Sequence, residues 1–448
     1  MNRIVVVVCV LAMMGHGLAR ADEGSTTNEV PVTATGEPDY KKLYEEQLKR
    51  NDSLEKRVSL LEEKDKNPPY TKTEDMPENT VKFLKQVDIS GYLTSSFNYN
   101  FNRPPDNLTI GQGYEYNANQ FMYNSFILIL QKSVDYDAFD WKAGFYTELI
   151  LGQDAAYTQA SGLSLGDEGD LEQAYVQVNA PLGNGVKIIF GKYVTPIGYE
   201  VVETALNANW TMGYQWTLFE PFTHTGLQLG YKISNEWEVN FYVNNGWDDV
   251  TDNNHSLSYI GRIYYTPNDK TSVTLIGFGG PEQTANNVDP GNGTPGADGH
   301  WREGVDFVVT YKCTPKVNTA VQVDYGHESQ AAVVGMDVNG DAIISGDAQW
   351  WGIGSWLTYD ITEKLQAAFR ADYVNDINGA RSSGSPSTAP FPVNTGQELY
   401  SLTLTMNYKP VEGLRFSPEF RFDHSTLNDA FDGHDTQILT TFGAAYSF

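Results

Sequence analysis

Cysteine and histidine are scarce in this sequence. Its 448 residues include only Cys9 and Cys313, and its seven histidines are scattered along the chain. So few thiols exclude a disulfide framework and a cysteine-based metal site. The histidines form no His-Glu-x-x-His run and no other metal-binding spacing. We therefore expect no metal centre and no bound cofactor.

Positive charge is also in short supply. The chain has 30 Lys and Arg against 57 Asp and Glu, which gives a formal net charge of -27. A strongly acidic chain repels the phosphate backbone. Nucleic acid is therefore excluded as a partner.

Long apolar runs are missing apart from Ile4–Met14, which follows Arg3 and precedes Ala19-Arg20-Ala21. This run is too short to cross a membrane as a helix, because a span needs about 20 apolar residues. Its length and flanks predict a secretory signal peptide over residues 1–21, with a membrane anchor as the alternative. No later run approaches the length of a membrane-spanning helix.

Two polar segments follow the predicted cleavage site. Residues 22–38 are rich in Thr, Glu, Pro and Gly and predict a flexible linker. Residues 39–66 are helical in composition, with Leu54, Val58 and Leu61 on one heptad seam. This segment is either a solvated amphipathic helix or a short coiled coil that joins subunits. Residues 67–86 form a connector.

From Val87 onward, large and polar residues alternate. Phe97, Tyr99 and Phe101 share one parity, and Asn98 and Asn100 share the other. The same alternation returns in residues 237–244 and 414–422. Aromatic residues reach 13% of the chain although its mean hydropathy is only -0.40. This combination is typical of strands that show one face to lipid and the other to water.

The connections between these strands predict the architecture. Seven are short, near residues 134–137, 181–185, 234–236, 267–270, 314–316, 361–364 and 410–413. Eight are long and rich in Asn, Asp, Gly, Ser and Pro, near 102–120, 154–169, 196–223, 248–256, 282–303, 331–348, 376–397 and 425–434. Short and long connections alternate, so they join about sixteen strands. We predict an all-β fold over residues 87–448: a closed antiparallel transmembrane β-barrel in the outer membrane, with both ends in the periplasm.

The last strand ends on Phe448. Phe442, Tyr446 and Phe448 share one parity, and Phe448 is expected to close the last strand against the first near the membrane interface. A terminal aromatic residue on such a strand also resembles the signal read by the outer-membrane assembly machinery. Outer-membrane lipids and that machinery are thus expected partners.

One region resembles a known family. The segments "LEQAYVQVNAPLGNGVKIIFGKYVTPIGYEVVE", "PFTHTGLQLGY" and "NNGWDD" are similar to outer-membrane β-barrel porins described as OmpL-like. The resemblance covers roughly residues 87–448 and is most specific from Leu171 to Asp249. "GKYVTPIGYE" is also similar to a segment of the phosphate-selective porins, which carry an amino-terminal coiled coil. The resemblance implies diffusive passage of solutes, fixes no substrate and supplies no catalytic residues.

The third long connection carries the candidate pore constriction. Glu200, Glu203 and Glu220 are interspersed there with apolar residues such as Val201 and Leu206. General porins fold the loop after their fifth strand into the lumen, and this loop holds the equivalent place. Carboxylates on a segment that narrows the pore would bias the choice of ion. The alternative is a surface loop that lies over the barrel mouth.

Charged residues of inward parity are candidates for the pore lining. From Asp88 to the end there are 42 acidic and 17 basic residues, a balance of -25, which favours cations. The chosen pore-lining candidates are Lys142, Glu148, Glu238, Asp306, Asp324, Arg415, Glu419 and Arg421, and Asp140, Glu172, Lys187 and Arg370 share their parity. A register slip of one residue would reverse individual members.

Other motifs are weaker. Residues 337–347 resemble the start of a calcium loop, but Ala342 and Ala348 replace the turn glycine and the closing acid. His424 and Ser425 are adjacent on a strand, so they point to opposite faces and cannot form a catalytic pair. We therefore expect a non-enzymatic porin for small hydrophilic solutes that forms homo-oligomers, with trimers favoured. A porin selective for anions or sugars and a surface adhesin or structural barrel are the alternatives.

Overall fold

A computed structural model describes residues 82–83, 85–138, 140–283, 299–336, 342–392 and 396–448. The predicted signal peptide, linker and helical segment lie outside the described residues, and so does most of the connector. Within the described part, none of the helices is long and apolar enough to cross a membrane. Residues 87–448 form one compact unit.

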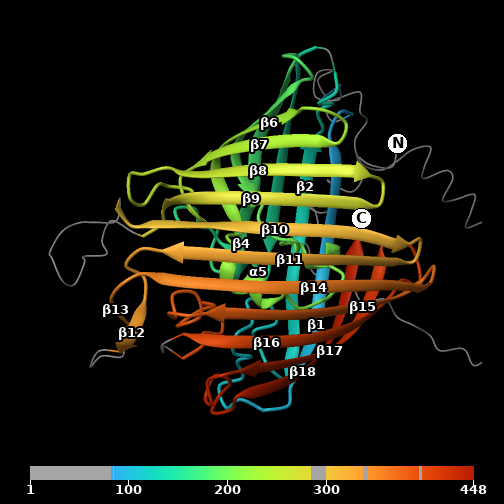
Figure 1. The fold of residues 1–448 in the computed structure, drawn as a ribbon. Helices are drawn as coiled ribbons and strands as arrows, with labels where there is room; N and C mark the ends of the chain where they lie inside the picture. The colour runs from blue at the N-terminus through green and yellow to red at the C-terminus, as the bar shows by residue number, and fades with distance from the viewer. Residues whose placement is uncertain (1–81, 84, 139, 284–298, 337–341, 393–395) are drawn as a thin grey trace, which may run out of the picture. The chain divides into compact units, whose positions relative to one another are not determined.

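Sixteen antiparallel strands of the described residues close into a barrel (Figure 1). They are β1 (Asp88–Asn100), β2 (Gln120–Lys132), β3 (Lys142–Leu151), β4 (Gly169–Ala180), β5 (Val186–Val194), β6 (Thr223–Lys232), β7 (Trp237–Asn244), β8 (Ser258–Asn268), β9 (Thr271–Pro281), β10 (Trp301–Thr314), β11 (Val317–Glu328), β14 (Ala348–Thr362), β15 (Leu365–Asp376), β16 (Gln397–Tyr408), β17 (Leu414–Ser425) and β18 (Thr436–Ser447). A hairpin of β12 (Val333–Met336) and β13 (Ala342–Ile344) branches from the connection between β11 and β14. The predicted fold class is confirmed.

The alternation seen in the sequence sets the two faces of the wall. On β17, Phe420 is exposed, whereas its neighbours Glu419 and Arg421 are buried inside. On β18, Phe442 and Tyr446 are exposed and Leu439 is fully buried. The strands therefore turn many large apolar side chains outward, where lipid can solvate them, and most of their charged side chains toward the lumen. Some apolar residues, such as Leu439, also lie on the inner face.

The two ends of the barrel differ. Connections at one end are short, such as residues 269–270 between β8 and β9, and connections at the other end are long, such as residues 195–222 between β5 and β6. The expected alternation of seven turns and eight loops is confirmed by this strand order. We call these the short-turn end and the long-loop end.

The chain end closes the ring. β1 pairs with β18, with Tyr92 opposite Ser447. Beyond the last ladder pair, the backbone N–H groups of Gly91 and Phe448 each donate to the carbonyl of the other residue at 3.1 Å. The Phe448 ring is stacked on Phe126 with the ring centroids 6.2 Å apart. The expected pairing of the last strand with the first is thus present.

The third long loop, residues 195–222, is called L3 here. It contains a short 3-10 helix, η2 (Thr204–Leu206), and the helix α5 (Tyr214–Phe219). All six residues of α5 are buried, and Trp216 packs with Tyr114, Val202, Met212 and Phe222. Burial of each large apolar side chain in such a cluster contributes about 1.5–3 kcal/mol. This apolar cluster lies inside the barrel wall and holds L3 in place.

Candidate pore constriction

L3 extends through the lumen to the opposite wall. It leaves β5, and its Glu200 reaches Arg370 on β15, which is eight strands from β5 in either direction around the ring. In Figure 1, α5 is seen through the wall, behind β11 and β14. The contacts of L3 thus span the barrel interior. Whether L3 sets the pore size stays a prediction.

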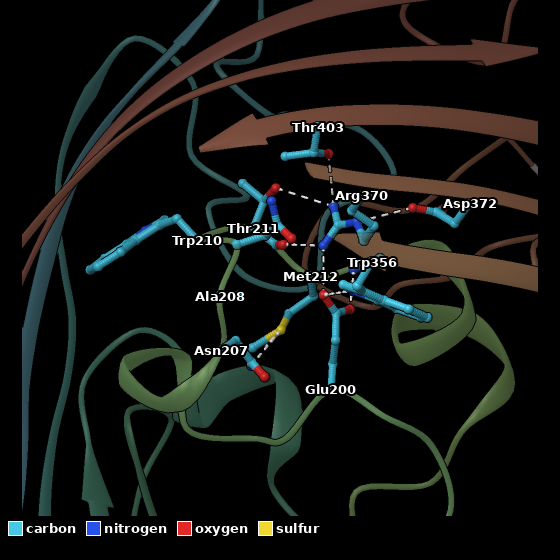
Figure 2. A network of polar contacts seen from close by, with 12 residues as sticks. Glu200, Asn207, Ala208, Trp210, Thr211, Met212, Trp356, Arg370, Asp372 and Thr403 are labelled. Carbon is cyan, nitrogen blue, oxygen red and sulfur yellow. Dashed lines mark hydrogen bonds and ion pairs between the residues drawn. The ribbon is translucent and has the colours of Figure 1, made fainter. Parts of the chain in front are cut away.

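Arg370 joins L3 to the wall (Figure 2). Its Nη1 donates to Glu200 Oε1 at 2.7 Å and to the Thr211 carbonyl at 2.5 Å. Its Nη2 donates to Thr403 Oγ1, and its Nε lies 3.0 Å from Asp372 Oδ1. The side chain is fully buried, so its charge is stable only because two carboxylates lie beside it.

Two more arginines hold the L3 backbone. Arg415 donates to the carbonyls of Asn207 and Thr204 at 2.8 and 3.0 Å. Arg421 donates to the Met212 carbonyl, and its Nε is 2.8 Å from Asp423 Oδ1. A guanidinium has five donors in a fixed plane, so it can bind a carboxylate and backbone carbonyls together.

Trp210 is held between two carboxylates. Its backbone N–H donates to Glu419 Oε2 and its indole N–H donates to Glu115 Oε1, both at 2.6 Å. Glu115 lies on the first long loop and is fully buried, and Asn124 also donates to it. Burial, followed by the charge of Asp154, raises the pKa of Glu115 well above its usual range.

Glu220 lies against two aspartates. Asp306 on β10 and Asp324 on β11 occupy directly opposite positions of the ladder and both point into the barrel. Gln322 donates to Glu220 Oε1 at 2.6 Å and to Asp324 Oδ2 at 3.0 Å. None of these three acids forms an ion pair with a lysine or arginine that the structure describes.

Glu203 faces Glu148 on β3. Both side chains are buried. The side-chain amide of Gln173 and the hydroxyl of Tyr146 both donate to Glu148 Oε2. Burial raises the pKa of Glu203, whereas hydrogen bonds from its own backbone and with Glu148 lower it. The structure therefore brings every glutamate of the predicted constriction against a charged side chain of the wall.

Most of the other predicted lining residues lie nearer the short-turn end, whereas Glu172 lies near the long-loop end of β4. Lys142 is exposed at the start of β3, with its Nζ 2.9 Å from Asp140 Oδ2. Glu238 and Lys187 border a cavity of about 230 Å³. Arg415 borders a larger cavity of about 590 Å³ that also touches Leu206 beside L3. Glu172 is buried and accepts a hydrogen bond from Thr158.

Sequence reasoning did not single out several residues of this site. Asp372 and Asp423 each stand two positions after an inward arginine, so strand parity could have found them. Glu115 and Gln215 gave no such indication, because they lie in loops without a period. Among the described residues, no group of three or more His, Cys, Asp or Glu is arranged to hold a metal ion.

Comparison with solved structures finds proteins of similar fold. OprB of Pseudomonas putida aligns with a TM-score of 0.54 and 11% identity over 83% of this chain and 96% of its own. OmpF of Salmonella typhi aligns with a TM-score of 0.52 and 13% identity over 81% of this chain and 97% of its own. DcaP, an outer membrane channel of Acinetobacter baumannii, aligns with a TM-score of 0.50 and 14% identity over 81% of this chain and 97% of its own. At these identities the likeness shows the fold alone.

A closed barrel with a lipid-compatible outside and a charged, loop-filled inside defines an outer-membrane β-barrel channel of the porin class. Residues 86–448 match the family model described as "Putative beta-barrel porin-2, OmpL-like", and the chain belongs to that family. A search of curated proteins gives no significant match. The resemblance noted in the sequence is thereby confirmed.

Proposed function

We propose that this protein is a porin through which small hydrophilic solutes diffuse, with a preference for cations, and that L3 forms its constriction. The observation that carries the proposal is the set of buried carboxylates along L3 and the facing wall. Glu203 with Glu148, and Glu220 with Asp306 and Asp324, have no paired lysine or arginine among the described residues.

The basic residues of the interior support the same sign of selectivity. Arg370 and Arg421 are compensated by the carboxylates of Glu200, Asp372 and Asp423. Lys192 is compensated by Asp170 at 2.6 Å. Among the described residues, Arg415 has no ion pair and binds the carbonyls of Asn207 and Thr204 instead. Where the unpaired carboxylates of L3 and the facing wall are ionised, no described lysine or arginine pairs with them, and their field favours cations. That field acts strongly on a passing ion because little water screens it in a narrow lumen.

We assign residues 1–21 to a signal peptide, place residues 22–86 and the short-turn end in the periplasm, and expect homo-oligomers with trimers favoured. Phe448 is the proposed signal for the outer-membrane assembly machinery. The signal peptide and the periplasmic placement are supported by the composition of the segments and by the even number of strands. Trimers are favoured by analogy with other porins, and the role of Phe448 is a resemblance to known assembly signals.

The test is the reversal potential of single channels in a KCl gradient at pH 8. The double variant Glu148→Gln/Glu203→Gln removes charge while keeping shape. Its cation preference should fall markedly, with a much smaller change in conductance. The matched control neutralises two exposed loop acids, Asp167→Asn/Asp429→Asn, and should behave as the wild type. Equal shifts in both variants, or an anion preference of the wild-type channel, would overturn the proposal.

A further inference from the structure

The two ends of L3 meet at one patch of the wall. Near its start, the backbone N–H of Gly198 donates to Asp306 Oδ1 at 3.4 Å, and that of Tyr199 donates to Gln322 Oε1 at 2.9 Å. Near its end, Glu220 accepts from Gln322. The carboxyl groups of Glu220, Asp306 and Asp324, here called the root cluster, thus contact both ends of L3.

The root cluster is buried and acidic. The exposed fractions of Glu220, Asp306 and Asp324 are 3%, 0% and 5%. Glu220 Oε2 and Asp306 Oδ2 are buried without a hydrogen-bond partner among the described residues. Three ionised carboxylates at this depth would each cost several kcal/mol of desolvation and would also repel one another.

The neighbours of the root cluster do not supply the missing positive charge. From L3, Gln215 donates to Asp324, and Glu200 adds another carboxylate that is already bound to Arg370 of β15. From β11, Gln322 contributes an amide. Arg302 of β10 is 2.8 Å from Glu328 and does not bind the cluster. Among the described residues, neither these three acids nor any other such group is arranged to hold a metal ion. The ligand that fits the root cluster is therefore the proton.

We propose that protons bound by Glu220, Asp306 and Asp324 latch L3 to the barrel wall, so that L3 is docked at acidic pH and its ends are released at alkaline pH. If the proposed function holds, this release widens the channel. The latch itself does not depend on which ions pass.

The direction follows from proton linkage. Burial, followed by the charges of Asp324 and Asp306, raises the pKa of Glu220 well above its usual range. A carboxyl whose pKa is raised by docking favours docking below its undocked pKa. It opposes docking progressively as the pH rises toward the raised value. The Glu203–Glu148 contact acts in the same direction, whereas the ion pair of Glu200 with Arg370 keeps the middle of L3 attached.

Hydrogen exchange of the Gly198 and Tyr199 amides tests the latch directly. Full-length protein in lipid nanodiscs is compared at pH 5 and pH 9, with each rate divided by the intrinsic rate at that pH. In the wild type, the protection factor should fall by about tenfold or more, which is the change expected for one pKa unit of difference between docked and undocked states.

Three variants complete the design. Glu220→Gln and, separately, Asp306→Asn/Asp324→Asn should remove most of the pH-dependent loss of protection, because neither leaves three titrating acids together. Asp167→Asn, an exposed acid on the second long loop, should keep the wild-type loss. Should the double variant fail to fold, the nearly isosteric Glu220→Gln decides alone. Equal protection of the wild type at both pH values, or a loss unchanged in Glu220→Gln, would overturn the latch.

The conduction test stays separate from this one. A wild-type channel without cation preference would contradict the proposed function and leave the exchange result standing. A cation-preferring channel whose Gly198 and Tyr199 amides are as well protected at pH 9 as at pH 5 would contradict only the latch.

Discussion

Arg370 shows how one side chain can determine the path of a loop. It is fully buried, and it binds Glu200, the Thr211 carbonyl and Thr403 from a strand on the far side of the lumen. Removing one partner of a buried ion pair is costly because the other charge stays buried without compensation. Arg370 therefore matters more for the position of L3 than its distance along the sequence suggests.

We expect Arg370→Met to weaken the attachment of L3 by about 3–5 kcal/mol, because Glu200 and Asp372 then lack their counter-charge. The Gly213 amide, which donates to Glu200 Oε2 at 2.7 Å, reports this attachment through its hydrogen exchange. Adding Glu200→Gln to Arg370→Met should recover part of the loss. Arg103→Met, at an exposed arginine, is the control, and an equal effect of the two single variants would contradict the prediction.

Phe448 allows a second prediction at this scale. Deleting Phe448 removes both of its backbone hydrogen bonds with Gly91 and its ring contact with Phe126. We expect less barrel to be assembled in the outer membrane, whereas the barrels that do assemble conduct normally. Phe442→Ala is the control, because it removes a similar lipid-facing ring within β18. It should assemble better than the variant that lacks Phe448. Full assembly of the deletion variant would show that this residue is dispensable.

L3 is the element on which the site depends, and its geometry is tight at Gly198. This residue has a φ of +93°, and a Cβ added there would lie 1.9 Å from Glu220 Oε2. Glycine reaches such a backbone conformation without strain, whereas other residues pay about 1–2 kcal/mol. The close approach of the two ends of L3 therefore requires glycine at this position.

Gly198→Ala should consequently push Glu220 away from the root cluster. We expect the Tyr199 amide to lose protection at pH 5, where the wild-type loop is docked. Gly277→Ala is the control, because a Cβ on Gly277 meets no atom within 4 Å. Unchanged protection at Tyr199 would mean that the loop tolerates the added methyl group without moving.

The strands could be predicted from the sequence, but the contacts of L3 could not. Alternation has a period of two residues, so each strand carries its own pattern in a dozen residues. Trp210 and Glu419, in contrast, are separated by 209 positions, and no local pattern links them. Parity placed Glu419, Arg415 and Arg421 on the inner face. Only the closed fold shows that they bind L3 there.

At the scale of the whole molecule, we predict that the protein forms homo-oligomers. If residues 39–66 associate in the periplasm, deletion of residues 22–86 should loosen the oligomer and leave the barrel folded. Native gels of the purified deletion variant would show faster migration, while the β-sheet content measured by circular dichroism stays the same. An oligomer that survives the deletion unchanged would remove the segment from this role.

The contacts of Trp210 also have a consequence for the order of folding. Its indole lies against Gly443 of β18, and its backbone binds Glu419 of β17. Part of the docking surface for a loop in the first half of the barrel is thus supplied by the last two strands to be synthesised. Contacts so distant in sequence form late and slowly. We therefore expect L3 to dock only when the final strand has emerged and the ring has closed. A nascent chain that lacks β18 would lack part of the surface that Trp210 contacts.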